Sequence, residues 1–259
     1  MYLSNFFEDA DDELIGCIRC RDAKPLNLEL KMAFQPIVDV EQRSVFAYEA
    51  LVRGADGASA AQVLGAVKPD EMYSFDQTCR VLAIETAQRL GMQTYLSINF
   101  LPNAVYEPAS CIRLTLAAAR KVGFSPDRLI FEITESEKIR NPEHALKIIK
   151  DYRQRGFLTA IDDFGAGYSG LNLLADFQPH IVKLDMALTR DIDRDAVRRA
   201  IVAGVIGTCN ALGCQIIAEG IERPEELDTL RNMGVSLFQG YLLARPALES
   251  LPEPDMRYC

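Results

Sequence analysis

The sequence predicts an α/β protein folded as a (β/α)8 barrel in which one of the first two strands runs antiparallel to the others. Eight apolar, strand-like runs recur along the chain, and helical patterns separate most of them. This alternation is typical of a parallel sheet covered by helices. Only residues 41–43 separate the first two runs, which is too few for a crossover helix. These two strands are therefore expected to form a hairpin.

The elements follow in order along the chain. Strands are expected at residues 34–40, 44–51, 94–100, 128–134, 158–164, 180–186, 214–221 and 235–243. Helices are expected at residues 75–90, 142–155 and 195–212, each followed by a glycine, and a further helix starts with the sequence PEEL at residues 224–227. On the helix at residues 75–90, Asp76 and Glu85 are expected to be solvent-exposed charges.

Three parts are expected along the chain. Residues 1–31 do not follow the strand–helix rhythm and form an N-terminal extension, residues 32–250 form the barrel domain, and residues 251–259 form a C-terminal tail. Cys17 and Cys20 in the extension form the sequence C-I-R-C. A zinc site would need two more ligands nearby, so a redox pair, a metal clip between subunits and two reduced thiols all stay open.

Composition excludes several classes of protein. The formal net charge of −9 argues against a protein that binds nucleic-acid polymers, because such proteins carry a basic stripe. No window holds the roughly 18 consecutive apolar residues of a membrane span. The acidic N-terminus lacks the basic start of a signal peptide, and the seven cysteines are odd in number and scattered. We therefore expect a cytoplasmic protein with reduced thiols and no membrane association.

Polar residues stand at the ends of most predicted strands, where an apolar core would not tolerate them. They are Glu49, Asn99, Glu132, Asp162, Asp163, Lys183, Asp185, Glu219 and Gln239. In a barrel of this kind the strand ends converge on one face, which is where catalytic residues collect. The pattern therefore predicts one active site built from several strands.

Five of these carboxylates, those of Glu49, Glu132, Asp162, Asp163 and Glu219, would repel one another without a cation. The chain has only two histidines, His144 and His180, and neither stands at a suitable strand end, so the ligands would all be oxygen atoms. Oxygen ligands favour Mg²⁺ or Mn²⁺ over zinc, and Ca²⁺ would suit inhibition better than chemistry. The adjacent Asp162 and Asp163 can reach two ions, which favours a two-metal centre.

A glycine motif in the chain suggests an alternative. Gly165, Gly167 and Gly170 spell G-x-G-x-x-G after a strand, as in a dinucleotide-binding turn. A pyrophosphate there binds bare amides at a helix N-terminus, and the preceding Asp162 and Asp163 would repel it. We therefore favour a loop that folds over a metal-bound substrate.

Several ordered motifs along the chain form a recognisable pattern. They are Y-E-A-L-V-R at 48–53, F-E-I-T-E at 131–135, D-D-F-G-A-G-Y-S at 162–169, K-L-D at 183–185, A-E-G-I-E at 218–222 and Q-G-Y-L-L-A-R-P at 239–246. In these motifs, residues 32–246 resemble the EAL-domain family of bacterial cyclic di-GMP phosphodiesterases. The resemblance implies a modified TIM barrel of EAL type, whose first strand is antiparallel.

The resemblance also implies roles for individual residues. Glu49, Asn99, Glu132 and Asp162 are similar to ligands of a first metal ion, and Asp162, with Asp163 beside it, would reach the second. Lys183 resembles the residue that holds and polarises the attacking water, and Glu219 a second-metal or water-positioning glutamate, so that Glu49, Lys183 and Glu219 are the expected catalytic residues. Gln35, Arg53 and Gln239 resemble substrate-binding residues, and Glu135 would anchor the D-D-F-G-A-G loop.

The implied activity is hydrolysis of cyclic di-GMP to linear pGpG with two Mg²⁺ or Mn²⁺ ions, in a homodimer whose N-terminal extension could dock a protein partner. One alternative is an EAL domain that acts as a cyclic di-GMP receptor or protein-interaction module without turnover. Another is an unrelated metal-dependent barrel enzyme with a different phosphate or enol substrate. The retention of every expected ligand favours the phosphodiesterase.

Overall fold

Strands β1 (Leu30–Asp39) and β2 (Ser44–Gly54) form the antiparallel hairpin that the sequence predicts. The turn between them is stabilised by Asp39, whose carboxylate accepts hydrogen bonds from the backbone N–H groups of Glu41 and Gln42. Arg43 completes the reversal with a φ of 52°. These observations come from a computed structural model of the chain. It describes residues 24, 26–105, 107–134, 141–167 and 170–259.

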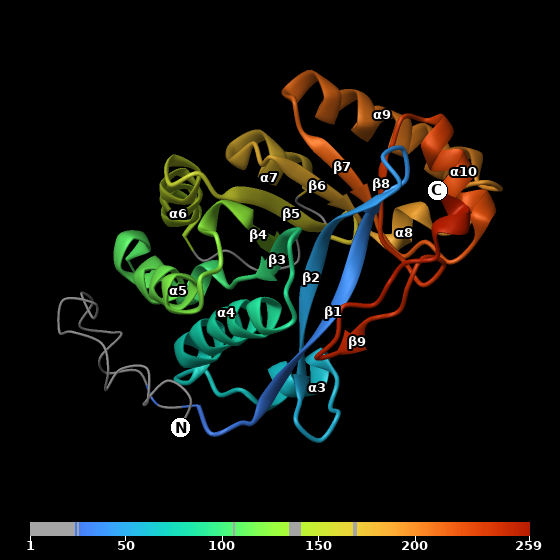
Figure 1. Cartoon of the computed structure of the whole chain (residues 1–259). Coiled ribbons are helices and arrows are strands. Elements are labelled where there is room, and N and C mark those ends of the chain that lie inside the picture. The colour runs from blue at the N-terminus through green and yellow to red at the C-terminus, as the bar shows by residue number, and fades with distance from the viewer. Residues whose placement is uncertain (1–23, 25, 106, 135–140, 168–169) are drawn as a thin grey trace.

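The other barrel strands run parallel to β2. They are β3 (Tyr95–Asn99), β4 (Leu129–Thr134), β5 (Leu158–Phe164), β6 (Ile181–Leu184), β7 (Gln215–Ala218) and β8 (Leu237–Phe238). Each pairs with the next, and β1 closes the ring because it pairs antiparallel with both β2 and β8. A further short strand, β9 (Ala247–Leu248), pairs with Ala33 and Phe34 near the start of β1. The predicted barrel with an antiparallel first strand is confirmed (Figure 1).

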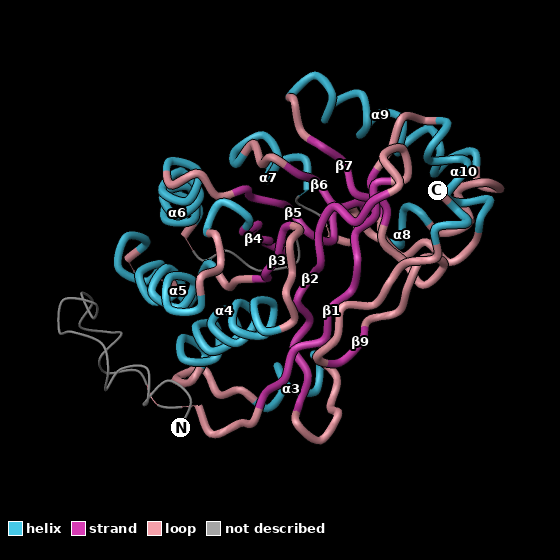
Figure 2. The backbone as a smooth tube through the Cα atoms, in the orientation of Figure 1, coloured by secondary structure: helices cyan, strands magenta, loops and turns pink. Residues whose placement is uncertain are grey.

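Helices surround this ring of strands on the outside (Figure 2). They are α3 (Ala60–Ala66), α4 (Met72–Arg89), α5 (Pro108–Val122), α6 (Pro142–Gln154), α7 (Gly170–Phe177), α8 (Met186–Thr189), α9 (Ala196–Leu212) and α10 (Pro224–Asn232). The predicted helices at 75–90, 142–155 and 195–212 correspond to α4, α6 and α9. None of the described helices combines the length and apolar character needed to cross a bilayer.

The expectation that Asp76 is solvent-exposed is wrong. Helix α4 packs against β1, β3 and α5, so it is covered on more than one face. Asp76 is only 2% exposed and forms an ion pair with the fully buried Arg80, with 2.7 Å between Oδ2 and Nη2. Glu85 on the same helix is partly buried, and this burial raises the pKa of its carboxyl group.

Candidate functional site

The barrel strands place an apolar layer and a polar layer on the same inner face. The apolar layer contains Ile37, Ala47, Ile130, Ala160, Ile181, Ile217 and Leu237. Side chains two residues apart on a strand point to the same face. Two residues further along the chain from the last six of these stand Glu49, Glu132, Asp162, Lys183, Glu219 and Gln239. In the antiparallel β1 the polar residue comes before the apolar one, so Gln35 precedes Ile37.

Lys183 lies where four of these carboxylates converge. Its ammonium nitrogen Nζ is 2.8 Å from Asp162 Oδ1, 2.9 Å from Glu219 Oε1, 3.0 Å from Glu132 Oε2 and 3.3 Å from Glu49 Oε2. The lysine side chain is fully buried. The structure thus brings together four acidic residues that are far apart in the sequence, around one buried cation.

The two adjacent aspartates both face this site because β5 is irregular at its end. In a regular strand Asp162 and Asp163 would point to opposite faces. The pairing of β5 with β6 shifts register between Ile161 and Phe164, and Asp163 has a φ of 54°. As a result, carboxylate oxygens of Asp162, Asp163 and Glu219 lie within 4.8 Å of one another.

Neutral polar side chains hold the carboxylates in place. Asn99 Nδ2 donates a hydrogen bond to Glu49 Oε1 at 3.0 Å, and Gln239 Nε2 donates to Glu49 Oε2 at 2.8 Å. Gln239 also reaches Gln35 Oε1 at 3.3 Å, and Gln35 in turn donates to the Ala244 carbonyl oxygen. Glu49 is therefore oriented from both sides.

Burial controls the protonation of this cluster. It raises the pKa of Glu132 to about 8, although Lys183 acts in the opposite direction. The pKa of Glu219 is also raised well above its ordinary value by burial, and that of Asp163 to about 6 by burial and the neighbouring Asp162. Burial would lower the pKa of Lys183, but the surrounding carboxylates, Asp162 first, raise it well above its ordinary value. One ammonium group does not offset the whole acidic cluster.

The donor set fits hard divalent cations. Oxygens of Glu49, Glu132 and Asp162 lie within 4.8 Å of one another, and Asp162 also belongs to the group with Asp163 and Glu219. The buried oxygen Oδ1 of Asp162 accepts no hydrogen bond of normal geometry from any described residue, although it lies 2.8 Å from Lys183 Nζ. Two adjoining all-oxygen groups that share one carboxylate match a pair of hard divalent cations.

A cavity of about 380 Å³ adjoins the cluster. Its polar lining includes Glu49, Asn99, Asp162, Asp163 and Glu219, and its apolar lining comes from β1, β2, β3 and helices α3 and α4. This combination of charged and apolar walls suits a ligand that has both polar and apolar parts.

Other candidate residues lie away from the acidic cluster or outside the described residues. Arg53, further along β2, donates from Nη1 to the Val52 carbonyl oxygen at 2.8 Å and does not line the cavity. His180 accepts a hydrogen bond from the Thr159 backbone N–H at the opposite end of β5. Glu135, residues 168–169 of the glycine-containing loop, Cys17 and Cys20 lie outside the described residues.

Sequence reasoning missed two contributors to the site. Ser97 is fully buried on β3, two residues before Asn99, and its hydroxyl donates to Glu132 Oε1. The period of two that singled out Asn99 could have found it. Asp76 lines the cavity from α4 and accepts a hydrogen bond from the Leu101 backbone N–H at 2.9 Å. The sequence around Asp76 gives no indication that its side chain lies at the cavity.

Comparison with known proteins identifies the family to which this barrel belongs. The EAL domain family model matches residues 20–246. The chain belongs to the EAL domain family. Among solved structures, this EAL domain is similar to a standalone versatile EAL protein from Vibrio cholerae O395 in its c-di-GMP-bound form. The TM-score is 0.87, the sequence identity is 48%, and the match covers 90% of this chain and 98% of that one.

A second solved structure is the manganese/cy-diGMP complex of Klebsiella pneumoniae BlrP1. It has a TM-score of 0.83 and 36% identity, and the match covers 89% of this chain and 60% of that one. Both structures support the assignment of the barrel as EAL-type.

Two curated relatives point to different roles. The blue light- and temperature-regulated antirepressor BluF of Escherichia coli (strain K12) is 32% identical over 246 residues, covering 95% of this chain and 60% of BluF. The cyclic di-GMP phosphodiesterase RocR of Pseudomonas aeruginosa is 33% identical over 172 residues, covering 66% of this chain and 43% of RocR. The matches therefore span less than two thirds of the length of these relatives.

Proposed function

We propose that this EAL domain is a metal-dependent phosphodiesterase that hydrolyses cyclic di-GMP to linear pGpG. The observation that carries the proposal is the convergence of two all-oxygen carboxylate groups, sharing Asp162, around the buried Lys183. Relatives named as cyclic di-GMP phosphodiesterases and neighbours solved with this dinucleotide support the choice of substrate.

The acidic cluster, with Asn99 beside it, would hold two Mg²⁺ or Mn²⁺ ions. Glu49, Asn99, Glu132 and Asp162 would provide the first set of ligands, with Asn99 using its amide oxygen. Asp162 would be shared with the second ion, which Asp163 and Glu219 complete. Ca²⁺ would occupy the same oxygens with a looser geometry and is expected to inhibit.

The chain's own groups then prepare the hydrolysis. When bound, the ions lower the pKa of water and stabilise negative charge on the phosphate. Lys183, held by carboxylates on several sides, donates a hydrogen bond to the oxygen of the attacking water and fixes its position. Water adds to one phosphorus and the P–O3′ bond breaks, which leaves a 5′-phosphate and a 3′-hydroxyl. Gln35 and Gln239 would bind the substrate, Arg53 would do so only with its side chain turned from Val52 toward the cavity, and Glu135 would anchor the loop at residues 162–167.

A turnover assay tests this proposal. Purified chain is incubated with cyclic di-GMP and Mn²⁺ or Mg²⁺, and the products are separated by ion-exchange chromatography. We expect pGpG from the wild type and a loss of about 10–100-fold or more in Glu49→Gln, since a ligand should matter at least as much as its outer-shell partners. Glu143→Gln, an exposed glutamate on α6, is the matched control and should keep full activity. Equal turnover in Glu49→Gln and the control would refute the assignment.

The similarity to the antirepressor BluF favours a second candidate function, in which the domain binds cyclic di-GMP or a protein partner without turnover. The same assay separates the two. Retention of cyclic di-GMP by the protein with no pGpG formed under Mg²⁺ or Mn²⁺ would favour the receptor. The N-terminal extension is then a candidate docking segment, which a chain starting at residue 32 would test.

A homodimer and a cytoplasmic location complete the proposal. Helix α9 has no charged residue from Ala200 to Leu212, and Val197, Ile201 and Leu212 are 68%, 48% and 46% exposed. An exposed helix face of this kind is a candidate surface for a second copy of the chain, because a twofold axis would pair the face with itself. The buried thiols of Cys79, Cys209 and Cys214, which form no disulfide, suit a reducing compartment.

A further inference from the structure

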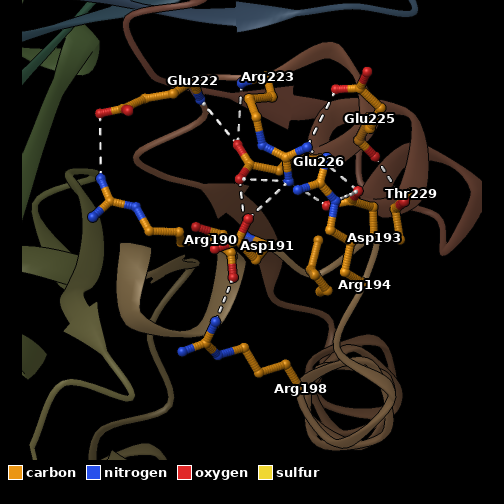
Figure 3. Close-up of polar contacts among 12 residues, drawn as sticks. Arg190, Asp191, Asp193, Arg194, Arg198, Glu222, Arg223, Glu225, Glu226 and Thr229 are labelled. Atoms are coloured by element: carbon orange, nitrogen blue, oxygen red, sulfur yellow. Dashed lines mark hydrogen bonds and ion pairs between the residues drawn. The ribbon is translucent and has the colours of Figure 1, made fainter.

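A buried carboxylate joins the two chain segments that follow β6 and β7. Glu226 on α10 is 2% exposed, and its two oxygens accept hydrogen bonds from three backbone N–H groups. Asp191 donates to it at 2.9 Å from the segment after β6, and Glu222 and Arg223 donate at 3.1 Å each from the segment after β7 (Figure 3). Because the donors come from both segments, this one side chain fixes their relative position.

Arg223 closes the same junction from the other side. Its guanidinium Nη2 lies 3.1 Å from Asp191 Oδ1 and 3.3 Å from Glu226 Oε1, and it also donates to Asp193. Asp191, Asp193 and Glu226 could geometrically surround a metal ion, but the Arg223 guanidinium already lies among them (Figure 3). We call Asp191, Asp193, Arg223 and Glu226 the clasp.

Helix α8 connects the clasp to Glu219. Thr189, at the last turn of α8 and fully buried, donates from Oγ1 to the backbone carbonyl oxygen of Glu219 at 2.6 Å. The next residue, Gly220, has a φ of 66° and lies against Met186 at the start of α8, so closely that a Cβ atom there would collide with the methionine. The backbone at Glu219 and Gly220 therefore packs against α8. The clasp, through Asp191, holds the chain just after the C-terminal end of α8.

Glu219 needs such support more than the other carboxylates do. Glu49, Glu132 and Asp162 lie inside strands β2, β4 and β5, where the ladder of hydrogen bonds fixes the backbone. Strand β7 has only four residues and ends at Ala218, one residue before Glu219. The N–H of Glu219 still donates to the Leu184 carbonyl oxygen of β6 at 3.0 Å, so β6 fixes one side of this residue. Its carbonyl side is held by Thr189, and this part of the support depends on α8 and the clasp.

We propose that Thr189 and the clasp are positioning residues for one of the two metal ions, because they hold Glu219 against Asp162 and Asp163. The proposal rests on the proposed function. It assigns an asymmetric role: the group formed by Glu49, Glu132 and Asp162 takes its backbone support from strands, so its ion does not depend on the clasp. Outer-shell partners of this kind typically change metal affinity by about 10–100-fold.

Isothermal titration of the full-length chain with Mn²⁺ tests the proposal without relying on turnover. We expect the wild type to bind two ions per chain, and Thr189→Val and Arg223→Gln each to weaken one by about 10–100-fold while leaving the other unchanged. Thr189→Val keeps the size of the side chain and removes only the hydroxyl, and Thr189→Ser should restore the affinity. Arg194→Gln is the matched control: Arg194 pairs with Asp193 at 3.2 Å and its side chain is 70% exposed, but it does not bridge the two segments.

The contrary outcomes are distinct. If the wild type binds two ions and both affinities stay unchanged in Thr189→Val and Arg223→Gln, the clasp is only structural, even if the melting temperature falls. Equal weakening of both ions would also overturn the inference, because it would indicate a general disturbance of the barrel. A wild type that binds no Mn²⁺ would refute the proposed function itself.

Discussion

Lys183 Nζ and Asp162 Oδ1 lie 2.8 Å apart at the carboxyl ends of neighbouring strands β5 and β6, and both are buried. Asp162 is also the carboxylate that the two acidic groups share. The lysine therefore neutralises part of the negative charge beside the carboxylate that two metal ions would share. Lys183 is fully buried inside the barrel and does not line the cavity. We therefore expect this one side chain to stabilise the acidic cluster when no metal is bound and, in the proposed reaction, to place the attacking water.

Replacing this lysine should separate the two roles. In Lys183→Met we expect kcat to fall by about 10²–10³-fold, the effect typical of removing one preorganised donor. Without metal, the loss of the buried cation should also cost about 3–5 kcal/mol of unfolding free energy, because the carboxylates are left uncompensated. Mn²⁺ should restore much of that stability, since it binds only the folded chain. Urea unfolding in EDTA and in Mn²⁺, together with turnover, measures both effects.

Lys147→Met is the control for this prediction. Lys147 is exposed on α6, so its replacement should change stability by less than about 0.5 kcal/mol and leave turnover intact. If Lys183→Met were as active as this control, the lysine would have no part in the reaction.

Much of the fold and of the site follows from simple periodicity. The short link around residues 41–43 predicted the hairpin, and β5 has the bounds expected from its sequence. A residue such as Glu132 is recognisable because it stands two positions after Ile130 on an otherwise apolar strand, and the same rule applies on β2, β6 and β7. The convergence of these residues then follows from the barrel topology.

Tertiary contacts account for what the sequence could not predict. The left-handed backbone at Asp163 depends on the register shift between β5 and β6. Glu226 reads as one of the acids in the first turn of a helix, but its carboxylate also bonds to Asp191, 35 residues away. Asp76 has the surroundings of an exposed helical charge in the sequence and becomes buried only when α4 packs against the barrel and α5.

The buried pair of Asp76 and Arg80 should be a major determinant of stability. Arg80 Nη1 also donates to the Tyr152 hydroxyl at 2.9 Å, and its guanidinium lies over the Phe100 ring, 5.2 Å from the centroid. Removing one partner leaves a buried charge, so Arg80→Met should lower the unfolding free energy by about 3–5 kcal/mol. The double variant Asp76→Leu with Arg80→Met should lose less than the single one, because no charge is then left behind. Urea denaturation at constant Mn²⁺ measures these values.

A matched ion pair with greater exposure provides the comparison. Asp151 on α6 and Arg155, which caps the end of that helix, are also four residues apart, with 2.7 Å between Oδ2 and Nε, but their side chains are 24% and 33% exposed. Arg155→Met should therefore cost only about 0.3–0.5 kcal/mol. Similar losses from Arg80→Met and Arg155→Met would contradict the importance of burial.

His180 should make the fold sensitive to mild acid. Burial, together with Arg153, lowers the pKa of its imidazole below the ordinary value of 6.5. Because the folded chain disfavours the charged ring, its contribution to stability is full above pH 6.5 and is lost as the pH falls from there toward the lowered pKa. We expect His180→Asn to have a flatter melting temperature profile between pH 7 and 5 than the wild type. A wild-type profile as flat as that of the variant would show that His180 does not contribute.

The uncharged face of α9 predicts which substitution should dissociate the proposed homodimer. Ile201 is 48% exposed near the middle of this face, and a twofold axis would bring it close to its own copy. In Ile201→Glu the two copies would each bury a carboxylate, so a dimer should dissociate to monomers in sedimentation velocity measurements.

Leu248→Glu on β9 is the matched control, because Leu248 is 47% exposed but lies on a different element, and it should leave the dimer intact. A wild-type chain that sediments as a monomer would refute the proposed dimer, and an Ile201→Glu chain that stays dimeric would place the interface elsewhere. Since α8 packs against α9, a dimer through this face would also restrain the helix that supports Glu219. We therefore expect the monomeric variant to bind one Mn²⁺ ion more weakly than the dimer does, and the same isothermal titration can measure this.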